Sequence, residues 1–163
     1  DDGTISSIGH AEIVEPRARQ LLNAIAFPKS LQEKVISLAI HHMKPHFEMG
    51  KSAIRRLSVE LDQATIDQLA DVAIADKSGR VADGNVQIVT CPNVDKMLQL
   101  AEEMRIRDSQ PEPILKGRHL IELGMKPEKE FGLILNRVYQ MQLDGLVNNL
   151  DEAIGEINNE KNK

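Results

Sequence analysis

SLQEKVISLAIHH, residues 30–42, is the stretch that decides the fold class of this chain. Ser30 and Glu33 stand three residues apart, which is the spacing of a capping box at the first turn of a helix. The apolar residues that follow recur at intervals of three and four, which is typical of one helical face. The stretch therefore predicts a helix that is capped by Ser30 and ends at Pro45, because proline lacks the N–H that an interior helical position donates.

The same apolar period predicts helices along most of the chain, so we expect an all-α fold. The other expected helices cover residues 52–61 and 65–78, a stretch that begins at Pro92, and residues 120–123, 127–141 and 150–157. Residues 83–85 have the composition of a turn, residues 86–90 are expected to form an extended connection, and residues 109–113 are the clearest linker. We expect a helical part over residues 1–108 and a small helical tail over residues 109–163.

Two local details of these helices can also be predicted. Pro16 is expected in the first turn of a helix that stops before Phe27, because a proline in a helix interior loses a hydrogen bond. Glu103 and Arg107 stand four residues apart on the helix that begins at Pro92, so we expect them to form an ion pair.

Composition narrows the functional class. The 163 residues include 25 acidic and 20 basic side chains, which give a net charge of −5, and 41% of the residues are hydrophobic. No apolar run approaches the roughly 20 residues of a membrane span, and the single cysteine, Cys91, favours a reducing, cytoplasmic setting. Four aromatic residues are too few for a sheet that stacks bases, which excludes RNA recognition modules.

Three short patterns have both a functional and an ordinary interpretation. Residues 50–52 (GKS) lack the upstream glycine of a phosphate loop, so a loop that leads into a helix capped by Ser52 is the better explanation. Four of the five histidines fall within the first 46 residues, and with Asp76 they offer metal-ligand chemistry, although structural or surface histidines are commoner at such spacings. Basic residues cluster as Lys51-Arg55-Arg56, Lys77-Arg80 and Arg105-Arg107-Lys116-Arg118; these clusters could bind phosphate or form solvated helix faces.

Several ordered motifs resemble the C-terminal helical region of bacterial tRNA nucleotidyltransferases, the CCA-adding enzymes and their poly(A) polymerase relatives. They are LKGRHLIELGMKP (residues 115–127), EFGLIL (130–135) and QLDG (142–145). Upstream, IGH (8–10), IHHMKP (40–45), AIRRL (53–57) and ADKSGR (75–80) resemble the HD-type segment of that family. The resemblance extends from about Ile8 to Ala153.

The resemblance implies a partial set of functional residues. It places His10, His42 and Asp76 at later metal-ligand positions of an HD site, with His41 as a less suitable substitute for His42, so any divalent metal should bind weakly. The family's Gly-Ser pair and Asp-x-Asp carboxylates, which hold Mg²⁺ and NTP, are missing here, so this chain alone should not transfer nucleotides. It looks like a piece that starts inside the HD domain, with the catalytic head upstream.

The leading hypothesis is a helical fragment that supports tRNA or RNA binding while the head of a nucleotidyltransferase adds nucleotides to the 3′ end. The residues expected to contact RNA are Lys116, Arg118, Lys126 and Arg137, with Arg55 and Arg56 second. One alternative is part of an HD-type metal-dependent phosphohydrolase, and another is an interaction module with neither activity. The sequence leaves the oligomeric state and the identity of the metal open.

Overall fold

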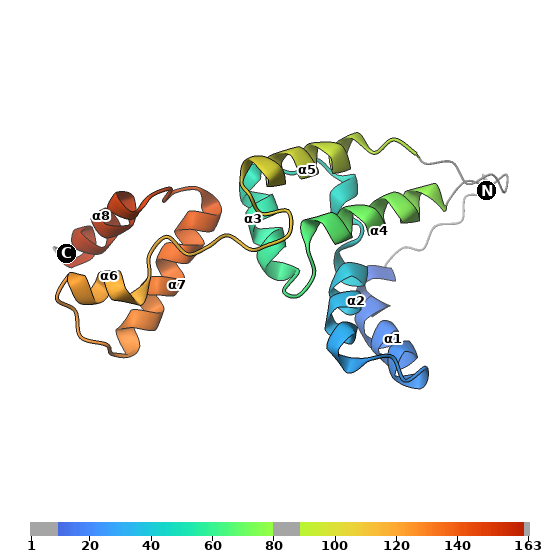
Figure 1. Cartoon of the computed structure of the whole chain (residues 1–163), viewed down its shortest axis with the longest axis horizontal. Coiled ribbons are helices and arrows are strands. Elements are labelled where there is room, and N and C mark those ends of the chain that lie inside the picture. Colours follow the sequence, from blue (N-terminus) through green and yellow to red (C-terminus); the bar gives the residue numbers. More distant parts are fainter. Residues whose placement is uncertain (1–9, 80–88, 162–163) are drawn as a thin grey trace.

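The chain folds into helices throughout the residues that its computed structural model describes, 10–79 and 89–161, and no strand occurs among them. The elements are α1 (His10–Ala24), α2 (Lys29–His41), the 3-10 helix η1 (Lys44–His46), α3 (Lys51–Glu60), α4 (Ile66–Ser78), α5 (Pro92–Glu103), α6 (Gly117–Glu122), α7 (Lys129–Asp144) and α8 (Leu150–Lys161). The predicted all-α class is confirmed. Figure 1 shows α1 to α5 in one group and α6 to α8 in another, and α3 packs against α7 where the groups meet.

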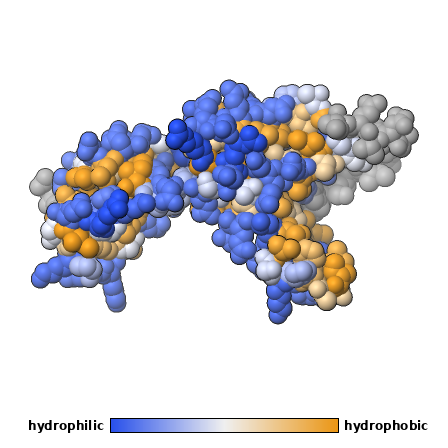
Figure 2. Space-filling view, in the orientation of Figure 1, coloured by the Kyte–Doolittle hydropathy of each residue, from blue (hydrophilic) through white to orange (hydrophobic). Residues whose placement is uncertain are grey.

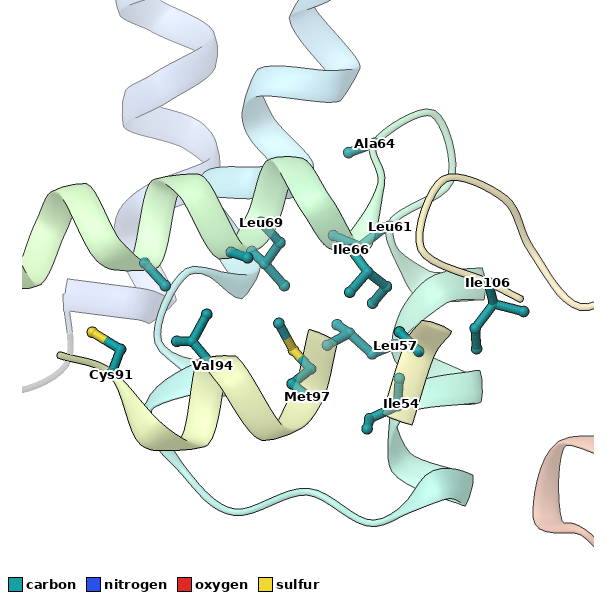
Figure 3. Packing of buried hydrophobic residues seen from close by; sticks show 13 residues of the cluster. Ile54, Leu57, Leu61, Ala64, Ile66, Leu69, Cys91, Val94, Met97 and Ile106 are labelled. Atoms are coloured by element: carbon teal, nitrogen blue, oxygen red, sulfur yellow. The ribbon is translucent and has the colours of Figure 1, made fainter. Parts of the chain in front are cut away.

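A large hydrophobic core lies between α3, α4 and α5 (Figure 3). Ile54 and Leu57 of α3, Leu69 of α4, and Val94 and Met97 of α5 are each at most 1% exposed. In α3 and in α5 the two residues stand three apart, which places them on one face of the helix. Full burial of one such side chain stabilises the fold by about 1.5–3 kcal/mol, so this core fixes the three helices relative to one another.

A second hydrophobic core holds α6, α7 and α8 together. Its buried members come from these helices and the segments beside them: Leu115, Leu120, Val138, Val147, Ala153 and Ile157. Gly124 closes α6 and Gly145 closes α7, each in the left-handed conformation that glycine adopts without strain. The helices predicted over 120–123, 127–141 and 150–157 are therefore present, each with somewhat different bounds.

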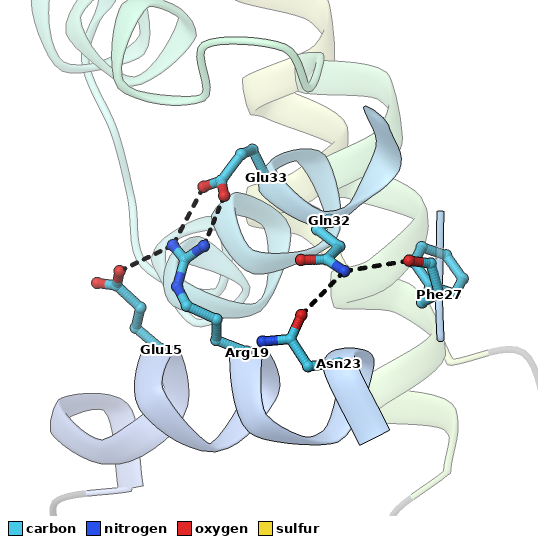
Figure 4. A network of polar contacts seen from close by, with 6 residues as sticks. All are labelled: Glu15, Arg19, Asn23, Phe27, Gln32 and Glu33. Carbon is cyan, nitrogen blue, oxygen red and sulfur yellow. Dashed lines mark hydrogen bonds and ion pairs between the residues drawn. The ribbon is translucent and has the colours of Figure 1, made fainter. Parts of the chain in front are cut away.

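Polar contacts join α1 to α2 in a hairpin that projects from the larger core (Figures 1 and 4). Arg19 donates to Glu33, with Nη1 2.6 Å from Oε1, and also to Glu15. The capping box predicted at Ser30 is wrong, because Glu33 binds Arg19 and α2 begins at Lys29 without a side-chain cap. Glu33 has the right spacing from Ser30 for a capping box, but it binds Arg19, which lies 14 residues away in the sequence.

The hairpin also carries an apolar surface, which is visible at the lower right of Figure 2. Ile13, Leu21 and Ile25 of the α1 segment are each more than half exposed. Pro16 lies inside α1 and not in its first turn as predicted, because the helix already begins at His10. An interior proline forfeits one helical hydrogen bond.

Thr65 caps α4 with the reciprocal bonds that were expected at Ser30. The Thr65 hydroxyl accepts from the Gln68 N–H at 3.2 Å, and the Gln68 amide oxygen accepts from the Thr65 N–H at 3.3 Å. The α3 helix differs, since its N-cap is Gly50 and no side chain caps it. The predicted cap by Ser52 is therefore wrong.

Four helices, α1, α5, α6 and α7, end in the same left-handed turn. In each, a residue with positive φ is followed by an N–H that donates to the carbonyl five residues earlier, as Ile106 does to Ala101 at 2.9 Å. This Schellman arrangement satisfies carbonyls at the helix end. Glycine occupies the left-handed position in α6 and α7, whereas Ala26 and Arg105 occupy it in α1 and α5.

The turn at the end of α5 explains why one predicted ion pair does not form. Arg107 follows the left-handed residue and so leaves the axis of α5, and its Nε lies 2.7 Å from Asp67 Oδ1. Glu103 binds Lys51 at 2.9 Å. The predicted pair of Glu103 and Arg107 is wrong.

The segment over residues 109–113 is non-helical, as predicted, and hydrogen bonds tie it to α7. Tyr139 Oη donates to the Pro111 carbonyl at 3.1 Å, and Gln142 Nε2 donates to the Glu112 carbonyl at 2.9 Å. The turn predicted over 83–85 and most of the extended connection predicted over 86–90 lie outside the described residues. None of the described helices combines the length and apolar character that crossing a membrane requires.

Candidate nucleic-acid interface

Basic residues gather in the first half of the tail. Residues 114–141 contain five basic and three acidic side chains, whereas residues 142–160 contain five acidic and no basic ones. The positive charge therefore lies on α6, on the α6–α7 connection and on the first part of α7. A local cationic surface can hold phosphates even on a protein of net negative charge.

Two of the predicted RNA contacts lie at the start of α6, and both are exposed to solvent at least in part. Lys116 is the N-cap residue, and its backbone N–H donates to His119 Nδ1 at 3.1 Å. Its Nζ lies 3.1 Å from Glu112 Oε2, in a solvent-exposed pair of the kind that contributes little stability. Arg118 Nε lies 3.1 Å from His119 Nε2, and the other guanidinium nitrogens remain for a phosphate.

The connection to α7 adds two further cations. Lys126 is exposed, and so is Lys129, the first residue of α7, which was not among the predicted contacts. Neither side chain has an ion-pair partner among residues 10–79 and 89–161. Arg137, also predicted to contact RNA, is half-buried on α7 and presents less of its side chain to solvent. We define the cationic tail face as Lys116, Arg118, Lys126 and Lys129.

Arg55 and Arg56 lie instead at the junction of α3 and α7. Arg55 Nε donates to the Leu143 carbonyl at 2.9 Å. Arg56 donates to Asp144 Oδ1 from Nε at 3.0 Å and from Nη2 at 2.6 Å, and Nη1 donates to Gln140. Both guanidinium groups therefore join the two groups of helices, and a phosphate would have to compete with these protein acceptors.

Two of the three predicted metal ligands, His42 and Asp76, have side chains among the described residues. His42 Nδ1 lies 2.7 Å from the Ala39 carbonyl of the preceding helix. Asp76 Oδ2 lies 3.6 Å from Nε2 of His46, which was not in the predicted set. His10 begins α1, and its side chain lies outside the described residues. Within the part of the chain that the structure describes, no three His, Cys, Asp or Glu side chains are arranged to hold a metal ion.

His41, the weaker substitute in the predicted metal set, lies at the end of α2 and is partly buried. Its Nδ1 is buried without a hydrogen-bond partner in the described structure. Burial lowers the pKa of His41 below its usual value, and the positive charge of Lys44 lowers this pKa further. Burial therefore favours the neutral form of this imidazole.

The cationic tail face has the chemistry of a surface that could bind anions. The cationic tail face offers exposed ammonium and guanidinium donors, and guanidinium can hold a phosphate with two parallel hydrogen bonds.

A curated protein of Thermus thermophilus is 29% identical to the chain over 153 residues, which make up 93% of the chain. That relative is a CC-adding tRNA nucleotidyltransferase.

The similarity confirms the family resemblance that the motifs indicated. The chain spans 33% of the length of this relative. No protein-family model matches the chain, and neither does any solved structure at a significant level. The motifs from residue 115 onward thus pointed to the same kind of protein as the match over 93% of the chain.

Proposed function

We propose that this chain is the C-terminal helical part of a tRNA nucleotidyltransferase, and that its cationic tail face holds phosphates of the tRNA. Nucleotide addition at the RNA 3′ end would belong to the rest of the parent protein, since this sequence lacks the carboxylate pair that holds Mg²⁺ and NTP. The observation that carries the proposal is the similarity to a CC-adding tRNA nucleotidyltransferase over 93% of the chain.

The distribution of cations supports the placement of the RNA on the tail. Lys116, Arg118, Lys126 and Lys129 are accessible to solvent and belong to adjoining elements, α6 and the start of α7. Several cations of the α3–α5 group are engaged by protein acceptors, as Lys51 is by Glu103 and Arg107 by Asp67. Phosphate contacts of this kind position an RNA without reading its sequence.

The phosphohydrolase alternative receives no support from the described residues. A metal centre of that kind needs several convergent ligands, and no three His, Cys, Asp or Glu side chains among the described residues are arranged to hold a metal ion. We therefore retain only the RNA-binding role as the proposed function of this chain.

The test is a titration of labelled tRNA with the 163-residue chain at low salt. The triple variant Lys116→Ala/Arg118→Ala/Lys126→Ala should bind about tenfold or more weakly, because three phosphate contacts are lost. The matched control is Arg17→Ala/Lys29→Ala/Lys34→Ala, which removes the same charge from the α1–α2 hairpin and should leave affinity nearly unchanged. Equal affinities for wild type and the tail variant, or an equal loss in both triple variants, would contradict the proposal.

A further inference from the structure

An open groove of about 420 Å³ lies between the two groups of helices and is lined by the segment after α5, by Arg55 of α3 and by residues at and after the end of α7. Its lining is rich in polar side chains, among them Arg55, Arg105, Gln142 and Asn148. Glu112 lines the same groove and accepts from Lys116 Nζ at 3.1 Å. The groove therefore borders the cationic tail face.

Arg105 is the cation of this groove that has no protein partner. Its side chain is exposed, and it makes no hydrogen bond or ion pair among the residues that the structure describes. The nearby acids Asp67 and Glu102 bind Arg107 instead, at 2.7 and 3.6 Å. Arg55, by contrast, is held in the groove by the Leu143 carbonyl.

The backbone at Arg105 is unusual for an arginine. Its φ of 57° lies in the left-handed region, at the position that Gly124 and Gly145 occupy at the ends of α6 and α7. A residue with a Cβ is strained there, whereas glycine is not. Arg105 therefore presents to the groove an exposed guanidinium that has no acceptor among the described residues.

We propose that Arg105 binds a phosphate of the RNA backbone in this groove, and so extends the cationic tail face across to the α3–α5 group. The inference rests on the proposed function, because it assumes that RNA lies along the tail. A guanidinium presents donors in a planar fork that matches two oxygens of one phosphate. The groove would thus place a phosphate beside the junction that Arg55 and Arg56 hold together.

The position allows a test in which stability and binding move in opposite directions. Arg105→Gly should raise the melting temperature by about 2–4 °C because it relieves the left-handed strain. The same variant should bind labelled tRNA about three- to tenfold more weakly at low salt, with a log–log salt slope smaller by slightly under one. Arg105→Lys should keep most of the affinity and the salt slope.

The matched control is Ala26→Gly, which relieves the same strain at the end of α1 and should raise the melting temperature without a change in tRNA affinity. Unchanged affinity in Arg105→Gly, while Lys116→Ala/Arg118→Ala/Lys126→Ala weakens binding, would overturn this inference and leave the proposed function standing. A lower melting temperature in Arg105→Gly would show that the side chain supports the fold and would also overturn it. Absence of tRNA binding by the wild-type chain would overturn both proposals.

Discussion

Replacing Gly145 by alanine tests the junction of α3 and α7 directly. Gly145 has a φ of +80°, and a Cβ added to it would lie 2.7 Å from Nη2 of Arg55. The left-handed conformation costs a residue with a Cβ about 1–2 kcal/mol. The new methyl group also displaces the Arg55 guanidinium from the Leu143 carbonyl, which adds about 1.5–3 kcal/mol for a hydrogen bond to a charged group.

Gly124 provides the matched control, because it has a φ of +77° and nothing lies within 4 Å of its added Cβ. Gly124→Ala should therefore cost only the backbone strain, about 1–2 kcal/mol, whereas Gly145→Ala should cost about 2.5–5 kcal/mol. Both glycines close helices of the second core, so urea unfolding of the same part of the chain measures both.

The Arg55→Ala background separates the two contributions. With the guanidinium removed, Gly145→Ala and Gly124→Ala should destabilise the chain by similar amounts, because only the backbone strain remains. If Gly145→Ala costs no more than Gly124→Ala in the wild-type background, then Arg55 does not pack against the end of α7 as described.

Three other predictions concern protonation, catalysis and metal binding. The pKa of His41 is lowered in the folded state, so folding favours its neutral form. The free energy of unfolding should therefore be highest above the unfolded pKa of about 6.5 and should decrease as the pH falls below it. Melting temperatures between about pH 7.5 and 5.5 should therefore decrease less for His41→Gln than for wild type, and equal decreases would contradict the buried imidazole. The 163-residue chain should incorporate no labelled CTP or ATP into tRNA, because it lacks the carboxylates that hold Mg²⁺ and NTP, and any incorporation would refute this. Calorimetry with Mn²⁺ or Zn²⁺ should show no submicromolar binding, because no three potential ligands among the described residues are arranged around one metal ion; tight binding that Asp76→Ala abolishes would require a complete metal site.

Helix positions could be predicted from the sequence because apolar spacing reflects burial. The period in residues 52–61 and 65–78 indicated α3 and α4 within about one residue, and Pro92 indicated the start of α5. Capping was less predictable, since Ser30 and Thr65 both stand three residues before a side chain that can complete a capping box. Only Thr65 forms one, because Glu33 is bound by Arg19 from the neighbouring helix.

In the candidate site, too, residues within a local motif could be predicted from the sequence, whereas contacts between distant residues could not. Lys116, Arg118 and Lys126 could be chosen from the sequence because they lie within the family motif over residues 115–127. Arg55 donates to Leu143 and Arg56 donates to Asp144, and each hydrogen bond joins residues 88 positions apart. Local spacing in the sequence could not predict these contacts. Arg105 was not singled out from the sequence, because its left-handed backbone conformation is seen only in the folded structure, at the end of α5.

Salt dependence of tRNA binding tests the central claim most directly. Phosphate contacts release counterions, so each contact contributes slightly under one unit to the slope of log affinity against log salt concentration. The cationic tail face predicts that the wild-type chain binds labelled tRNA with a slope of about −2 to −4, and that Lys116→Ala/Arg118→Ala/Lys126→Ala reduces the slope toward zero. A wild-type slope near zero, or the same steep slope in the triple variant, would contradict phosphate binding by the tail.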